Sequence, residues 1–137
     1  MLNSFTLFFP AGEKYFIRSI TRVLNQIDDK ELKQEAKIFI KQEAQHYIEH
    51  EKFLDNLRDH GYKIDHILKF IDILTTKIIE PSLGPKLNIA ATAGLEHFTA
   101  LLAEVGLSSG ILKEAQTELQ QLFEWHAAEE IEHKAAV

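Results

Sequence analysis

Apolar residues recur every three to four positions along most of the chain, and this spacing predicts an all-α protein. No run alternates β-branched with polar residues over a useful length, so no strand competes with the helices. Prolines and glycines fall between the periodic segments and divide them. The pattern predicts five helices with these approximate limits: Ala11–Asn25, Lys30–His60, Asp65–Ile79, Lys86–Val105 and Gly110 to the end.

Several helix ends carry recognisable signals. Pro10 suits the first turn of the first helix, because the proline needs no amide hydrogen there. Asp28 or Asp29 can cap the second helix with a side-chain oxygen. Gly61 can adopt the left-handed conformation that ends a helix. The remaining predicted boundaries are a connection at Ser82–Pro85, an end at Gly106 and a cap at Ser108 or Ser109.

Length and composition fit one globular domain that spans residues 1–137. Hydrophobic residues make up 45% and charged residues 26% of the chain, which is ordinary for a globular protein. The net charge of −6 argues against nucleic acid and anionic membranes as partners. The absence of cysteine excludes disulfides and thiolate metal sites. Neither a signal peptide nor a membrane-spanning run is evident, so we expect a cytoplasmic protein.

Two Glu-x-x-His pairs, Glu43/His46 and Glu130/His133, lie in long predicted helices. Chance placement of the glutamates and histidines gives roughly one such pair, so the pairs alone are weak. Each pair, however, follows a lone glutamate, Glu13 in the first case and Glu96 in the second. A four-helix bundle that holds two metal ions uses this set of ligands. Carboxylates and imidazoles suit iron and manganese, so the pattern predicts a dinuclear metal site.

Helical spacing places the polar residues of each pair on one face. At about 100° per residue, Glu43, His46 and His50 fall within roughly 60° of one another. The same projection groups three residues of the last helix: His126, Glu130 and His133. Glu96 lies in line with small residues, Ala100 among them, which allow close helix approach or leave room for a ligand.

Simpler interpretations compete with the metal site. Glu13 can be a solvated surface residue, and His126 can hydrogen-bond a ligand or simply fill the core. His50 can be an additional ligand, a partner of a ligand or a surface residue. Glu96 lies in the apolar segment Ile89–Leu102, where an unpaired buried carboxylate is costly, and this favours a ligand. His-Glu-x-x-His, Gly-rich phosphate-binding and Gly-x-Ser-x-Gly motifs are all absent.

Four stretches of the chain resemble a known family. They surround Glu13 (FPAGEK), Glu43 (QEAQHYIEH), Glu96 (GLEHFTA) and Glu130 (WHAAEEIEH). They are similar to the bacterial "predicted metal-dependent hydrolases" of the ferritin-like superfamily, and the last also resembles di-iron N-oxygenases that oxidise aryl amines. The resemblance implies a ferritin-like bundle and the following metal ligands: Glu13, Glu43, His46, Glu96, His126, Glu130 and His133. It also implies sequence beyond both ends, so the chain is either a shortened member or a fragment.

These observations predict a protein that binds two metal ions. We expect the ions to be iron, with manganese or zinc as alternatives. We expect oxygen-dependent oxidation or oxygenation of a small organic substrate. The first alternative is hydrolysis, because paired metal ions can acidify and orient a water. The second alternative is metal binding without catalysis. A homodimer is a further expectation.

Overall fold

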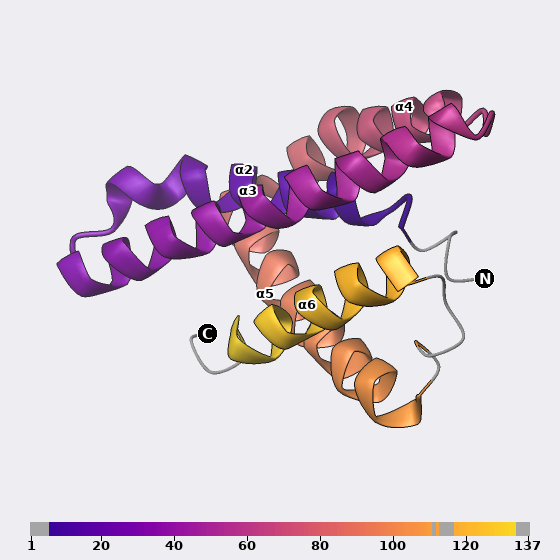
Figure 1. Ribbon diagram of the computed structural model, residues 1–137. Helices are drawn as coiled ribbons and strands as arrows, with labels where there is room; N and C mark the ends of the chain where they lie inside the picture. Colours follow the sequence, from indigo (N-terminus) through magenta and orange to yellow (C-terminus); the bar gives the residue numbers. More distant parts are fainter. Residues whose placement is uncertain (1–5, 111, 113–116, 134–137) are drawn as a thin grey trace. The chain divides into compact units, whose positions relative to one another are not determined.

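The computed structural model describes residues 6–110, 112 and 117–133, with the side chains of Glu118, Glu132 and His133 left aside. Every regular element in these ranges is helical, which confirms the all-α prediction (Figure 1). The chain divides into two compact units, Met1–Ile89 and Ala90–Val137. The ferritin-like arrangement and the single domain concern how these units combine, and both stay predictions.

The first unit begins with a pair of helices, α2 (Phe9–Val23) and α3 (Lys30–Asp59). They lie alongside one another and are joined through a 3₁₀ turn at Leu24–Gln26 (Figure 1). Pro10 occupies the first turn of α2, as predicted. The Asp29 side chain caps α3 and accepts hydrogen bonds from the amides of Glu31, at 2.8 Å, and Leu32, at 3.0 Å. This cap satisfies two of the amides that every helix start leaves without helical partners.

Gly61 ends α3 with a φ of +85°, a conformation that favours glycine over residues with a side chain. The amide of Gly61 donates to the carbonyl of Arg58 at 2.9 Å, and the amide of Tyr62 donates to that of Leu57 at 3.1 Å. This pair of bonds is the Schellman motif. The predicted stop at Gly61 is therefore confirmed, and its cause is the left-handed glycine.

The predicted connection at Ser82–Pro85 is longer than the break that the structure shows, which is at Gly84. Helix α4 (Asp65–Ile73) passes through a π-helical turn at Leu74–Ile79 directly into α5 (Glu80–Ser109). Pro81 is the second residue of α5, and it has no amide hydrogen to donate to the preceding turn. The helical path breaks only at Gly84, where φ is 70° and ψ is 171°.

The Asn88 side chain bridges the break at Gly84. Its Nδ2 donates to the carbonyls of Glu80, at 2.9 Å, and Gly84, at 2.8 Å. Its Oδ1 accepts a hydrogen bond of 2.8 Å from the Tyr15 hydroxyl. Burial, and then repulsion from Glu80, raise the pKa of Tyr15, so the hydroxyl keeps the proton that it donates. Asn88 thus ties the start of α5 to α2.

Glu80 joins the same two elements by charge. Its carboxylate is buried and accepts from Arg18 Nε and from Arg22, each at 2.8 Å. The arginine side chains keep 30% and 48% of their surface exposed, so they remain partly hydrated. Charge-assisted bonds to a buried carboxylate are among the stronger contacts that a helix pair can make.

The second unit contains the rest of α5 and helix α6 (Thr117–His133). One predicted boundary is wrong here. Gly106 does not end the helix, which continues to Ser109 and stops before Gly110, where φ is 73°. An interior glycine costs a helix only about 1 kcal/mol, which the apolar spacing on either side outweighs. The last helix is described over Thr117–His133, and the predicted start near Gly110 borders residues outside the described ranges.

We predict that Glu80→Gln destabilises the protein by about 1–3 kcal/mol, because the charge-assisted bonds from two arginines to a buried acceptor are weakened. The matched control is Asp55→Asn. Asp55 also pairs with an arginine, Arg58, but its side chain is 69% exposed. We expect the control to change stability by less than about 0.5 kcal/mol. Urea unfolding followed by circular dichroism measures both, and equal effects would contradict the role of Glu80.

Candidate metal site

The buried face of α3 is polar, and this is unusual for a helix of 30 residues. Its buried residues are Glu43, His46, His50 and Leu54. They recur at steps of three and four, so they share one stripe of the helix. The sequence predicted that Glu43, His46 and His50 share one face of the helix, and all three are buried on α3.

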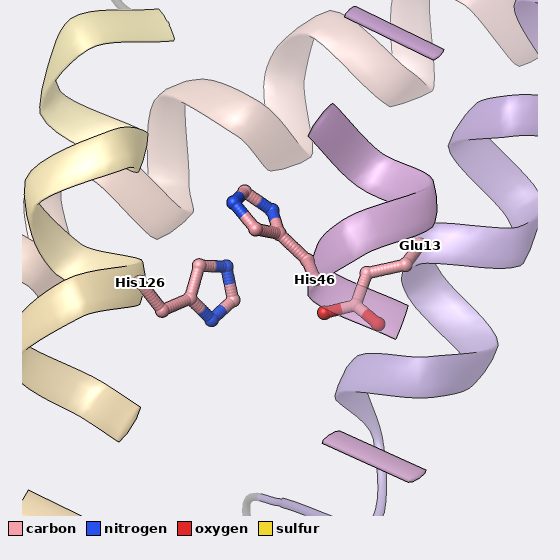
Figure 2. Close-up of side chains that lie close together, drawn as sticks. All are labelled: Glu13, His46 and His126. Carbon is pink, nitrogen blue, oxygen red and sulfur yellow. The ribbon is translucent and has the colours of Figure 1, made fainter. Parts of the chain in front are cut away.

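Glu13 of α2 adds a second buried carboxylate to this unit. Its side chain is 2% exposed, so the alternative of a solvated surface residue is wrong. Glu13 and His46 each offer a ligand atom within 4.8 Å of the other, and so do Glu43 and His46. Figure 2 shows Glu13 and His46 projecting from their helices beside one another. The first unit therefore brings two carboxylates to one buried imidazole.

His50 is fully buried, which removes its surface interpretation. Its Nε2 lies 3.5 Å from Glu13 Oε1, and its ring stacks on Phe9 with centroids 4.8 Å apart. His46 Nδ1 lies at the same distance, 3.5 Å, from Glu43 Oε1. Glu13 and Glu43 are thus each accompanied by their own imidazole. His50 can act as a further ligand or can orient Glu13.

The second unit contains a matching group on α5 and α6. Glu96, His126 and Glu130 are all buried. His126 Nε2 lies 2.9 Å from Glu130 Oε1, and the Thr99 hydroxyl lies 2.6 Å from Glu130 Oε2. His126 therefore contacts Glu130, a predicted ligand, directly. Figure 2 draws the His126 side chain on α6. The His133 side chain lies outside the described residues.

The separations of these pairs fit ligands of a common ion. Two donors with bonds of about 2.1 Å are about 3.0 Å apart at a right angle and about 3.4 Å apart at a tetrahedral angle. The His126–Glu130 distance of 2.9 Å matches the first value. The 3.5 Å between His46 and Glu43 is close to the second. A metal ion can therefore bind between such atoms with little side-chain movement.

Thr99 is a site residue that the sequence reasoning missed. Its only sequence signal is its place, one turn after Glu96 in an apolar helix. A threonine in that setting usually bonds its own helix, and the Thr99 hydroxyl does lie 2.9 Å from the Glu96 carbonyl. The contact with Glu130 depends on α6 being packed against α5 within the second unit, which no local pattern reveals.

The donor set narrows the ions that fit. The described groups offer carboxylate oxygens and imidazole nitrogens, and the chain has no cysteine. Iron, manganese and zinc accept such donors, whereas soft ions prefer sulfur ligands, and the chain has no cysteine to supply them.

In the part of the chain that the structure describes, no helix combines the length and apolar character that a membrane crossing requires.

An all-α fold with buried glutamate and histidine groups defines a class of protein that binds metal through oxygen and nitrogen. A comparison with protein families matches residues 1–137 to the model described as "Predicted metal-dependent hydrolase". The chain belongs to this family. Searches of curated proteins and of solved structures found no match.

We predict opposite effects of Glu43→Gln on the metal-free and metal-loaded protein. Without metal, Glu43 and Glu13 are like charges buried near one imidazole, so removing one should leave the melting temperature unchanged or raise it by a few degrees, corresponding to about 1 kcal/mol. With metal, the variant loses a ligand and should lose most of the stabilisation, which is about 2.7 kcal/mol at a hundredfold excess over the Kd.

Glu49→Gln is the matched control on the same helix. Glu49 is not part of the buried stripe, and its carboxylate lies 2.8 Å from Lys52 Nζ. The Glu49→Gln variant should therefore keep the full metal-induced rise in melting temperature. Thermal melts in a chelator and in Mn²⁺ or Zn²⁺ measure both effects. Equal metal-induced shifts in the two variants would exclude Glu43 as a ligand.

Proposed function

We propose that this protein is a hydrolase that uses two metal ions, held by glutamates and histidines from α2, α3, α5 and α6. The observation that carries the proposal is the burial of four glutamates, each no more than 5% exposed, with histidines beside them in a family described as metal-dependent hydrolases. The proposed ligands are Glu13, Glu43, His46, Glu96, His126, Glu130 and His133.

Charge balance supports two ions rather than one. Four ionised glutamates carry four negative charges, and burying uncompensated charge costs several kcal/mol per group. Two divalent ions neutralise them, and neutral histidines add donors without adding charge. Each unit supplies two of the four glutamates and at least one described histidine.

Hydrolysis agrees better with the findings than the oxygen-dependent oxidation expected from the sequence. The family description names hydrolysis, and no described feature favours oxygen chemistry. When bound, a pair of divalent ions lowers the pKa of a water and polarises the bond that the water attacks. The protein side chains hold the ions, fix their separation and keep bulk water out. Glu13 and Glu43 act here as ligands, with His50 and His46 each 3.5 Å from one of their oxygens. We expect a small organic ester, amide or phosphoester as substrate.

The test is turnover without oxygen. Metal-free protein is reloaded with Mn²⁺, Zn²⁺ or Fe²⁺ in a glove box and offered chromogenic phosphoesters, carboxylic esters and amides. We expect turnover in at least one class, with label from H₂¹⁸O in the product and loss of at least about a hundredfold in rate in Glu43→Gln. Turnover that needs O₂ and takes its oxygen label would establish oxidation instead. Metal binding with neither reaction would leave a protein that binds metal without catalysis.

A further inference from the structure

We infer that Thr99 is a positioning residue that holds one oxygen of Glu130, so that Glu130 binds metal through its other oxygen alone. The inference rests on the proposed function, because it concerns how one of its ligands is presented. It is carried by the 2.6 Å contact between the Thr99 hydroxyl and Glu130 Oε2.

A threonine hydroxyl has one hydrogen, and two acceptors compete for that of Thr99. The Glu96 carbonyl lies at 2.9 Å and Glu130 Oε2 at 2.6 Å. Hydroxyl bonds to ionised carboxylates are 2.5–2.7 Å long and roughly twice as strong as bonds between neutral groups. The shorter distance and the charge both assign the hydrogen to Glu130.

The two oxygens of Glu130 therefore face different partners. Oε1 lies 2.9 Å from His126 Nε2, a separation that suits two ligands of one ion. Oε2 is turned to Thr99 on the neighbouring helix of the same unit. A carboxylate fixed at one oxygen in this way has less freedom to rotate into two-oxygen binding. Thr99 thus fixes both the direction and the number of bonds that Glu130 makes.

The side chain of Thr99 is well suited to this role by position. It follows Glu96 by three residues, so it stands about one turn along α5 from a second proposed ligand. The contact with Glu130 joins α5 to α6 across 31 residues of sequence. Residues that hydrogen-bond a ligand typically change metal affinity or activity by about 10- to 100-fold when removed.

The test uses Co²⁺ as an optical probe in the full chain. Thr99→Val removes the hydroxyl and keeps the shape, and Thr99→Ser keeps the hydroxyl. We expect Thr99→Val to weaken Co²⁺ binding about tenfold or more and to change the visible absorption bands that report coordination. Thr99→Ser should restore affinity to within about threefold and recover the original bands, which a merely structural role would not predict. Thr99→Ala replaces Thr99→Val if circular dichroism shows that the valine variant does not fold.

Thr75→Val is the control, because the Thr75 hydroxyl bonds only its own helix, at the Ile71 carbonyl 2.8 Å away. It should leave affinity and spectrum unchanged. If wild-type protein binds Co²⁺ and Thr99→Val binds it equally with the same spectrum, the role of Thr99 is refuted while the metal site stands. If wild-type protein binds no Co²⁺, Mn²⁺ or Zn²⁺, the proposed function fails and this inference fails with it.

Discussion

Burial of carboxylates is the constraint on which this protein depends. Glu13, Glu43, Glu96 and Glu130 each lose nearly all contact with water, at a cost that apolar packing alone does not repay. Imidazoles lie beside three of them: His126 Nε2 is 2.9 Å from a Glu130 oxygen, and His50 and His46 are 3.5 Å from oxygens of Glu13 and Glu43. A divalent ion would offset the cost of burying these carboxylates. The stability of the fold therefore depends on metal binding at the proposed site.

The same constraint explains why the helices bury unusual faces. On α5, the buried residues include Asn88, Thr92 and Glu96, whereas Phe98 and Val105 remain 55% and 61% exposed. On α3 the buried stripe consists of three titratable residues and one leucine. Helices usually bury apolar stripes, so a polar buried stripe signals that chemistry rather than packing selected those positions.

Residues around the break at Gly84 position a helix of the proposed site without being ligands themselves. Asn88 donates to the carbonyls of Glu80 and Gly84 across the break, and its own oxygen accepts from Tyr15. Glu80 adds two arginines of α2 to the same junction. Tyr15 is two residues from Glu13, so this network fixes the helix that presents a proposed ligand. Precision at such sites depends on rigid supporting elements.

The sequence alone determined the all-α fold, a cap at Asp28 or Asp29, the stop at Gly61 and the faces that carry Glu43, His46 and His126. Those features depend on local periodicity and on the backbone preferences of single residues, which act over a few positions. It misplaced the ends near Gly84 and Gly106, because a glycine can bend or continue a helix depending on what packs around it. Only the tertiary structure decided that His50 is buried beside Glu13 and that Thr99 reaches Glu130. Such contacts join residues more than thirty positions apart, and no local pattern encodes which side chain lies opposite.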